Sequence, residues 1–494
     1  MSPSLRARLV DPRMTALGVG ALAGPLLVML STRSSPWVAA AVILGSIVGV
    51  AALTSPFSTL LLTAAVVPLE RLGRFSNDAD TVTFSLMRLM GALGIATLAI
   101  HWFIGRRKLK ITRPLVVYAI YIAVSALSLL GTSDLAKGAQ QVTAMVGSAL
   151  FLLLMTNVVI RQDQVRLPIV LWLATTAAVG VFSIYQWHNP NASVRVDRYD
   201  NTGLRTTDER FSTVMEDYGE YDTIGSVRRV LGPTSSPAVY GINIILALPF
   251  YIYLARTTRN LWMRLFSAAG FLVGCYNVIL TNTRAAVLTL VFAGVAIAAT
   301  RLVRVRFIGA IAVLVAAALV VPFLPSALYD RIFRVQSYTT EHSATLRIRL
   351  VYWQTAVDIF ADHWLLGCGI GNQNELPSRL SNMAMPANSS VHNEYLESLI
   401  ETGILGYPLI VGFMVILYRR LRSAERAFRA RGDTSTALFL TAARVGYYAV
   451  LFYALQCDVL HFTLKGWWLS MGLSVALSEM AAAMPPAAAN APAS

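Results

Sequence analysis

The stretch RRKLKITRPLVVYAIYIAVSALSLLGTSDLAKGAQQ, residues 106–141, contains the pattern that decides the fold. Its central part, residues 114–131, is an apolar run without a charged side chain, long enough as a helix to cross the hydrocarbon core of a bilayer. A strongly basic segment, residues 106–113, precedes the run, and a mixed polar segment follows it. Because basic connections stay on the cytoplasmic side of a membrane, the stretch predicts a spanning helix of defined orientation.

The same pattern recurs along most of the 494 residues, of which 56% are hydrophobic and only 14% charged. Apolar runs of about 17 to 22 residues alternate with short polar connections. The sequence therefore predicts an all-α polytopic membrane protein with about 14 transmembrane helices, within a range of 12 to 14. The expected spans are 14–30, 36–53, 56–69, 84–104, 114–131, 142–160, 167–185, 237–255, 265–281, 285–300, 307–325, 396–417, 437–456 and 466–483.

The formal net charge of +15 would suggest a nucleic-acid partner in a soluble protein. Here the basic residues form short clusters between apolar runs, as in residues 106–113, 161–166 and 418–431, whereas residues 132–141 and 281–284 are poorer in Lys and Arg. One alternation satisfies the whole chain and places both termini in the cytoplasm. The charge therefore indicates membrane orientation, and we expect no nucleic-acid partner.

The N-terminus and the cysteines indicate neither a cleaved signal peptide nor a disulfide or metal site. Residues 1–14 are basic and lead into an apolar run without a small-residue cleavage site, which predicts a retained first helix. Cys275, Cys368 and Cys457 are widely spaced and form no CxxC pair, so they predict packing residues rather than a disulfide framework or a zinc site.

Two connections, residues 186–236 and 326–393, are far longer than the others, and the alternation places both on the periplasmic side. Functional residues concentrate in such loops. The predicted division of the chain is N-terminal transmembrane helices 1–185, first long periplasmic loop 186–236, central transmembrane helices 237–325, second long periplasmic loop 326–393, C-terminal transmembrane helices 394–483 and disordered tail 484–494.

The second long loop contains RIRLVYWQTAVDIFADHWLLGCGIG, residues 347–371. Apolar residues recur there in steps of three or four, which predicts amphipathic helices lying against the membrane. The residues of the expected apolar face are Leu350, Trp353, Val357 and Phe360. Asp358 and Asp362 belong to this stretch and are expected on its solvated side, since their i, i+4 spacing alone does not make a metal site.

A histidine stands at the start of the next span, in SSVHNEYLESLIETGILGY, residues 389–407. Asn388, Ser389 or Ser390 is expected to cap a helix beginning near His392. In the first turn, the positive end of the helix dipole disfavours an imidazolium and keeps the ring able to accept a proton, as a general base must. The alternative is an interfacial histidine held by hydrogen bonds. Glu394, Glu397 and Glu401 share one side of this helix, and a solvated or cavity-lining face is expected for the latter two.

Two arginines are expected on the same side of the membrane as His392. Arg229 closes the first long loop in VRRVLGPTSSPAVYG, and Arg284 lies between two spans in LTNTRAAVL. Each taken alone fits an arginine that snorkels to lipid phosphate. Together, two planar guanidinium groups and a neutral imidazole would suit a diphosphate ligand and a nucleophile that must lose a proton.

These segments carry a family resemblance. HNEYLESLIETGILGY, RIRLVYWQTAVDIFADHWLLGCGIGN, LTNTRAAVL and RRVLGPTSSPAVYG together resemble the O-antigen ligase and O-antigen polymerase superfamily over residues from about 190 to 410. The family pattern often has Ser before the second arginine and Gly after it, whereas Thr283 and Ala285 stand here. Arg229 is preferred to Arg228 as the first arginine because it stands three residues before Gly232.

The resemblance implies a bacterial inner-membrane glycosyltransferase of the GT-C type that needs no metal or cofactor. It would move a glycan from undecaprenyl diphosphate to an acceptor hydroxyl at a periplasmic active site, with inversion. By analogy, Arg229 and Arg284 would hold the diphosphate and His392 would take the acceptor proton. Second-rank candidates for substrate contact are Arg228, Arg347, Arg349, Asn393 and Tyr395.

The acceptor and the partners stay open at this level. A polymerase would use another glycan as the acceptor and a ligase the lipid A core, and we favour a polymerase slightly because the loops show no specific core site. Expected partners are the lipid-linked glycan donor, membrane lipids, and a chain-length regulator or flippase. Alternatives from other classes are a transporter or flippase of lipid-linked glycans and a non-catalytic assembly subunit.

Overall fold

The computed structural model describes residues 55–69, 86–103, 109–189, 194–195, 210–211, 214–217, 227–234, 236–303, 341–372, 375–380, 391–457, 459, 461 and 463–485. The predicted spans 14–30, 36–53 and 307–325, and most of the predicted tail, lie outside these residues. So do large parts of both long loops.

Each predicted span that falls on described residues is a helix. These helices are α4 (Pro56–Val66, continued by Val67–Leu69), α5 (Leu86–Phe103), α6 (Arg113–Ser128, continued by Leu129–Gly131), α7 (Leu135–Val158), α8 (Arg166–His188), α9 (Pro237–Thr257), α10 (Leu261–Leu280), α11 (Arg284–Ala299), α16 (Glu394–Ala430), α17 (Thr434–Ala454) and α18 (Lys465–Ala483). Within the described residues, 7 helical segments are long and apolar enough to cross a membrane. The membrane class is confirmed, and the total of about 14 spans stays a prediction.

Two helices are longer than their apolar runs. α7 begins at Leu135 because the carboxylate of Asp134 caps it, accepting from the backbone N–H of Lys137 at 3.0 Å. α16 continues beyond its predicted end to Ala430, through a segment rich in Arg, Glu and Ala, which are good helix formers in water. Hydropathy therefore marks the part of each helix that suits the membrane, and caps mark where the helix begins.

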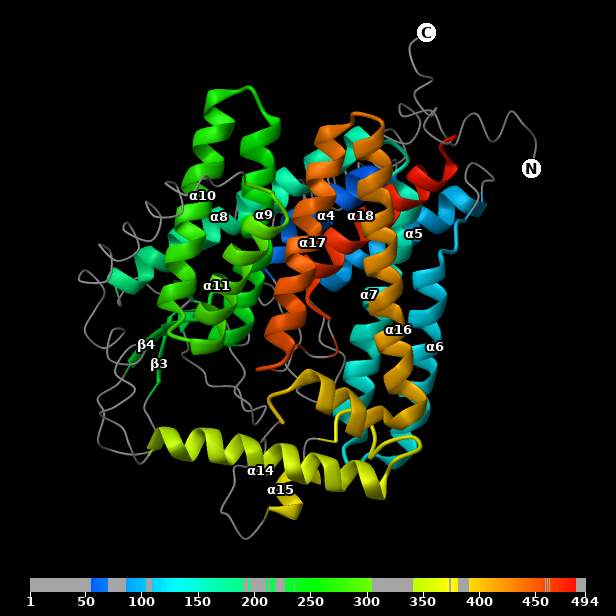
Figure 1. Cartoon of the computed structure of the whole chain (residues 1–494), viewed down its shortest axis with the longest axis vertical. Helices are drawn as coiled ribbons and strands as arrows, with labels where there is room; N and C mark the ends of the chain where they lie inside the picture. Colours follow the sequence, from blue (N-terminus) through cyan, green and yellow to red (C-terminus); the bar gives the residue numbers. More distant parts are fainter. Residues whose placement is uncertain are drawn as a thin grey trace, which may run out of the picture.

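Figure 1 shows the order of the helices from end to end. The α9–α10 connection, residues 258–260, and the α16–α17 connection, residues 431–433, lie at one end, called here the hairpin end. The α6–α7 connection and the α10–α11 connection lie at the other, called the α14 end after the helix α14 (Glu341–Asp362) that lies across it. The basic connections predicted this same grouping.

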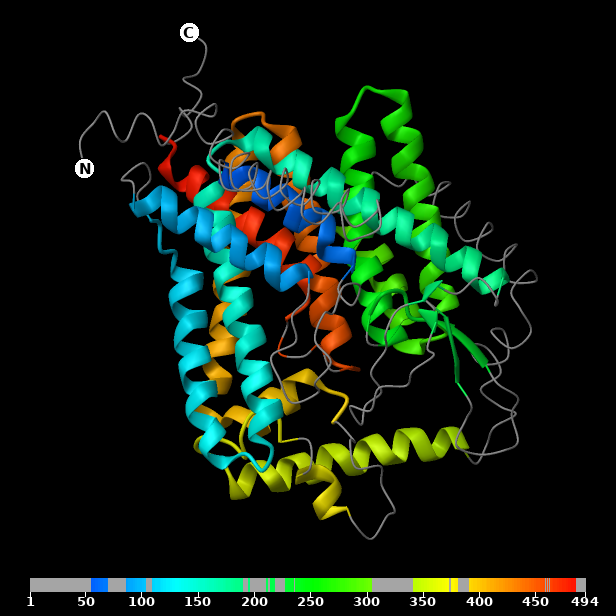
Figure 2. The same cartoon turned by 180° about the vertical axis from the view of Figure 1, so that it is seen from behind.

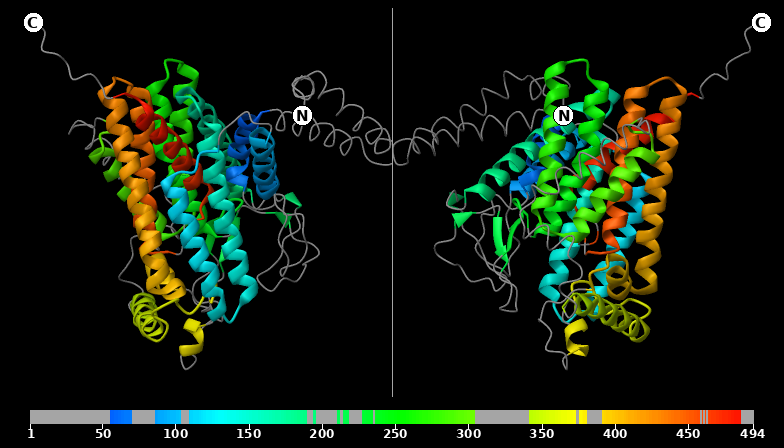
Figure 3. Two further views of the ribbon diagram at one scale, coloured as in Figure 1. Left: turned by 90° about the vertical axis from the view of Figure 1, so that its right-hand side faces the viewer. Right: turned by 60° about the vertical axis from the view of Figure 1, so that its left-hand side comes forward.

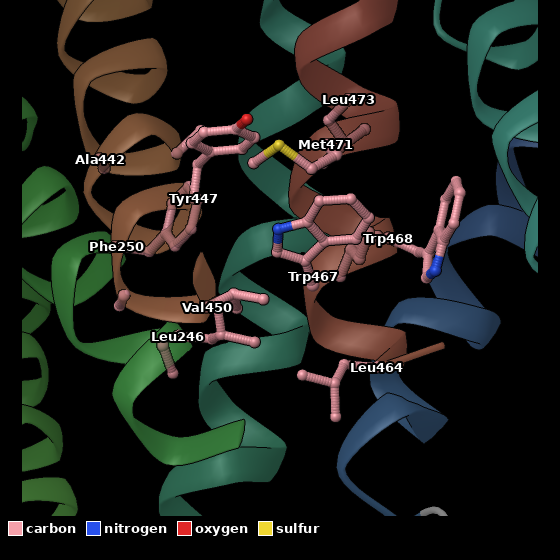
Figure 4. Packing of buried hydrophobic residues seen from close by; sticks show 14 of the residues in the cluster. Leu246, Phe250, Ala442, Tyr447, Val450, Leu464, Trp467, Trp468, Met471 and Leu473 are labelled. Carbon is pink, nitrogen blue, oxygen red and sulfur yellow. The ribbon is translucent and has the colours of Figure 1, made fainter. Parts of the chain in front are cut away.

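The core lies where α9, α17 and α18 meet. Trp467 and Trp468 of α18 are fully buried, and Trp468 packs on Phe413 of α16 with ring centroids 5.6 Å apart. Figure 4 shows these indoles beside side chains from α9 and α17, such as Phe250 and Tyr447. Such dense packing is what holds helices together where the surrounding lipid is itself apolar. The same packing fixes the relative positions of the connections at the α14 end.

Four short strands belong to the first long loop and are the exception to the all-α prediction among the described residues. They pair in two antiparallel ribbons, and Arg228 and Arg229 of one strand lie opposite Glu216 and Met215 of its neighbour. The strands are β1 (Val194–Arg195), β2 (Arg210–Phe211), β3 (Val214–Asp217) and β4 (Val227–Val230). Valine and alternating polar residues favour extended backbone in this polar loop.

α14 shows that the second long loop contains a helix over the predicted stretch, and Figure 3 shows it beneath the upright helices. Of the expected apolar face, Leu350 and Val357 are 53% and 56% exposed and Trp353 and Phe360 are half-buried, so contact of this face with the membrane stays a prediction. The side chains that pack inward are Tyr352, Ala356 and Ile359. Both sets of residues recur in steps of three or four, so periodicity alone could not choose between them.

Candidate functional site

Arg229 reaches the α10–α11 connection from strand β4. Its Nε donates to the backbone oxygen of Thr281 at 3.2 Å, and its Nη2 donates to Oγ1 of Thr283 at 3.1 Å. The adjacent Arg228 donates instead to the backbone oxygen of Trp187 at the end of α8, at 3.2 Å. Successive side chains of a strand point to opposite faces, which separates the two arginines. Arg229 is therefore the arginine that lies beside the segment carrying Arg284.

The corner after β4 holds this arrangement in place. Gly232 has φ of +55°, and a side chain there would collide with the ring of Tyr240 in α9. Two residues later, Oγ1 of Thr234 donates to the backbone oxygen of Leu231 at 2.7 Å. Ser236 then caps α9 by accepting from the N–H of Val239 at 3.2 Å. The GPTSSP sequence thus fixes β4 against α9 and so directs Arg229 to its partners.

Arg284 is the first residue of α11. Thr283 is the N-cap position, and its hydroxyl donates to the backbone oxygen of Thr281 while accepting from Arg229. The first turn of a helix presents unpaired N–H groups and the positive end of the dipole. The guanidinium of Arg229 beside this helix start, with Arg284 as the first helical residue, makes a site suited to an anion with several oxygens.

His392 precedes α16, which begins at the α14 end (Figure 1), and its side chain is exposed. The expected cap was wrong: Asn393 caps the helix, and its Oδ1 accepts from the N–H groups of Tyr395 at 3.0 Å and Leu396 at 3.2 Å. The helix begins at Glu394, so His392 is one residue before the cap and outside the first turn. Its φ is +52°, a strained conformation that persists only where neighbouring residues enforce it.

Both neighbours of His392 are fixed. The N–H of Val391 donates to Oε2 of Glu397 at 3.3 Å, and the backbone oxygen of Val391 accepts from the indole Nε1 of Trp353 in α14 at 3.2 Å. Asn393 is held by its own cap bonds. The backbone at His392 is therefore set by α14 on one side and α16 on the other.

Glu394, Glu397 and Glu401, in the part of α16 before its bend, are buried, which corrects the solvated or cavity-lining face expected for Glu397 and Glu401. The carboxylate of Glu394 accepts from the backbone N–H groups of Val459 at 2.7 Å and His461 at 2.9 Å. Oε1 of Glu401 accepts from the N–H of Gly371 at 2.8 Å. Each carboxylate thus binds backbone from a different connection at the α14 end.

His461 is the residue that the sequence reasoning missed. It is 2% exposed, has φ of +53°, and places Nε2 2.5 Å from Oε2 of Glu401. Its Nδ1 lies 3.3 Å from the hydroxyl of Tyr121 in α6. We call Glu394, Glu401 and His461 the clasp. The sequence offered one signal for it: His461 lies between two apolar runs, in a connection predicted to be on the same side of the membrane as His392.

A glycine-rich turn follows α14 and packs against the α6–α7 connection. Gly367, Gly369 and Gly371 all have positive φ, and side chains at Gly369 and Gly371 would collide with the backbone of the α6–α7 region. The N–H of Ile370 donates to the hydroxyl of Ser128 at 3.2 Å. The oxygen of the Asn372 side chain accepts from the hydroxyl of Ser133 at 2.6 Å. The turn anchors α14 to the membrane helices.

The second-rank candidates fall into different places. Asn393 is the helix cap, and the hydroxyl of Tyr395 donates to the backbone oxygen of Leu451 in α17 at 2.9 Å. Arg349 is half-buried on α14, and the side chain of Arg347 lies outside the described residues. Asn393 and Tyr395 therefore have structural partners that support the start of α16.

The described residues show no group of three or more His, Cys, Asp or Glu placed to hold a metal ion. Asp358 is exposed, as expected of the solvated side of α14, and Asp362 forms an exposed ion pair with Arg379 at 2.7 Å. Neither carboxylate is directed to a shared ligand position.

Fold and site define a polytopic helical membrane protein with an arginine pair and a strained histidine at the same end of the bundle, as the starts of α11 and α16 show in Figure 2. A family model described as O-antigen ligase matches residues 269–411, which include Arg284 and His392. This match supports the resemblance to the O-antigen ligase and polymerase superfamily over residues 269–411, and the segment of Arg229 lies outside it. A search of the curated proteins finds no match.

Proposed function

We propose that this protein is a glycosyltransferase that moves a glycan from undecaprenyl diphosphate to an acceptor hydroxyl on the periplasmic side of the bacterial inner membrane. The observation that carries the proposal is the pairing of Arg229 with Thr281 and Thr283, next to Arg284. The family match supports a membrane protein of ligase or polymerase type that processes a glycan. The resemblance supplies the donor class.

The reaction is a single displacement. The acceptor oxygen forms a bond to the anomeric carbon while the bond from that carbon to the diphosphate oxygen breaks. The acceptor proton passes to the imidazole of His392, and the electron pair of the broken bond stays on undecaprenyl diphosphate. Arg229 and Arg284 stabilise the negative charge that grows on this leaving group, and such donors commonly contribute about 10²- to 10³-fold in rate. A positioned general base contributes about 10²- to 10⁴-fold.

The experiment uses the full-length protein in lipid nanodiscs, a lipid-linked glycan as the donor, and chromatographic detection of released undecaprenyl diphosphate. Release is expected to survive a chelator and to fall at least about 10²-fold in His392→Ala. His363→Ala is the matched control, because His363 is also an exposed histidine at the α14 end. Unchanged release in His392→Ala, or movement of the donor across the bilayer without cleavage, would overturn the proposal.

The acceptor class separates two forms of the same reaction. A polymerase joins repeat units to one another on the lipid carrier, whereas a ligase transfers them to the lipid A core. The product made in a deletion strain distinguishes them: loss of chain length with single units still on the core indicates a polymerase. Loss of all units from the core indicates a ligase.

A further inference from the structure

Asn282 lies between the two threonines that bind Arg229, and its side chain has no described partner. The residue is 2% exposed, and among the residues that the structure describes neither Oδ1 nor Nδ2 finds a hydrogen bond. Leaving a buried polar group unpaired costs about 1–3 kcal/mol. Most buried polar atoms in proteins are paired, so an unpaired carboxamide beside a candidate anion site requires an explanation.

The backbone alone does not explain the asparagine. Asn282 has φ of +50°, which lets the chain turn from α10 to α11 so that the oxygen atoms of Thr281 and Thr283 both face Arg229. Asparagine tolerates this conformation, but glycine adopts it more readily and carries no polar group to bury. The side chain therefore adds a cost that the turn does not require.

A ligand held by the two arginines would lie within reach of Asn282. Asn282 is two residues from Arg284, and two residues of extended chain span at most about 7 Å. The carboxamide offers two N–H donors and one acceptor oxygen. Phosphate oxygens only accept hydrogen bonds, whereas a sugar hydroxyl or acetamido group also donates, so a sugar diphosphate satisfies both sides of the amide at once.

We propose that Asn282 binds the donor at the junction between its diphosphate and its first sugar. The amide N–H donates to a phosphate oxygen, and Oδ1 accepts from a polar hydrogen of that sugar. This inference rests on the proposed function and adds a residue and a substrate feature to it. The carboxamide is shielded from solvent, so the donor must displace the atoms that cover it. In such a water-poor space a hydrogen bond to a charged oxygen is strong.

The test measures binding of undecaprenyl diphosphate to the full-length protein in nanodiscs, with undecaprenyl monophosphate as the second probe. Asn282→Gly keeps the left-handed turn and removes only the carboxamide. It is expected to weaken undecaprenyl diphosphate binding about 10- to 100-fold, the worth of one hydrogen bond to a charged group, without lowering thermal stability. Asn282→Asp has the same shape but replaces the donor with a second negative charge, and it is expected to weaken binding further.

Asn260→Gly is the matched control, because Asn260 caps the opposite end of the same helix, α10, where glycine replaces it at little cost. It should bind both probes as the wild type does. A further comparison uses the glycan-bearing donor, for which Asn282→Gly should show a larger loss than for undecaprenyl diphosphate alone.

Two outcomes separate this inference from the proposed function. If His392→Ala loses turnover but Asn282→Gly binds undecaprenyl diphosphate as tightly as the wild type, the role of Asn282 is refuted and the transferase proposal stands. If His392→Ala keeps full turnover, the transferase proposal falls. A loss of melting temperature in Asn282→Gly would also refute the inference, since it would show that the buried amide stabilises the fold.

Discussion

Replacing Glu401 by glutamine tests whether the clasp holds the α14 end together. The carboxylate accepts from the N–H of Gly371 at 2.8 Å and lies 2.5 Å from Nε2 of His461, inside a fully buried environment. Hydrogen bonds to a charged group contribute about 1.5–3 kcal/mol and neutral ones about 0.5–1.5. Glutamine weakens the bond from Gly371 and removes the carboxylate that faces His461, so the substitution should lower the free energy of unfolding by at least about 1 kcal/mol.

The control is the same substitution at Glu479, which pairs with Arg420 at 2.7 Å while more than a quarter of each side chain is exposed. An ion pair of that exposure contributes about 0–1 kcal/mol. Reversible unfolding in detergent, with denaturant as the variable, gives both values. In addition, the double variant Glu401→Gln/His461→Gln should show a coupling energy of about 1 kcal/mol or more.

The reasoning is refuted if Glu401→Gln and Glu479→Gln lower stability equally, or if the Glu401 and His461 substitutions are additive. Either result would mean that the buried carboxylate gains nothing from its two partners relative to an exposed one. Turnover per folded molecule is a second measurement. If the clasp positions His392, Glu401→Gln should lower the turnover number more than the affinity for the donor.

Three further predictions follow from neighbouring contacts. Arg229→Lys should slow turnover about 10²-fold, because an ammonium cannot replace a guanidinium that binds the α10–α11 connection and a diphosphate at the same time. Arg228→Lys should change turnover little, and comparable losses in both variants would contradict the assignment. Gly371→Ala should destabilise the protein by about 2–4 kcal/mol, because Gly371 has φ of +78° and a side chain there would collide with the backbone of α7. Gly412→Ala, in a helix with open space around it, should be neutral or stabilising. Thermal unfolding measures both effects. Trp353→Phe removes the hydrogen bond from the indole to the backbone oxygen of Val391, next to His392, and should lower the turnover number without changing the melting temperature. A lower melting temperature with an unchanged turnover number would contradict this positioning role.

Much of the membrane frame was predictable, because a spanning helix is encoded locally in a run of apolar residues. Residues 114–131 illustrate this: their hydropathy predicted α6, and the basic flank predicted its direction. The alternation of connections also predicted that the starts of α11 and α16 lie at one end of the bundle, as they do. Hence Arg284 and His392 could be assigned to the same end from sequence.

The parts that escaped prediction depend on contacts between distant residues. Glu401 looked like a surface residue because its partners, Gly371 and His461, are 30 and 60 positions away and give no periodic signal. The cap of α16 was misplaced because Asn393 follows His392 directly, and a cap is defined by local backbone angles rather than by residue type alone. The face of α14 was ambiguous because two apolar faces share one helix.

The bend in α16 has a consequence for how such a protein can vary. Gly403, with φ of +60°, divides the helix, and there the N–H groups of Ile404 and Leu405 bind the backbone oxygens of Trp364 and Leu365. Residues 363–372 and 391–405 are thus joined into one frame by backbone bonds that do not depend on side-chain identity. Of the intervening residues, 375–380 are described, and Leu376 and Leu380 are buried against α14. Exchange or lengthening of residues 381–390 is therefore expected to leave this frame, and the backbone at His392, in place.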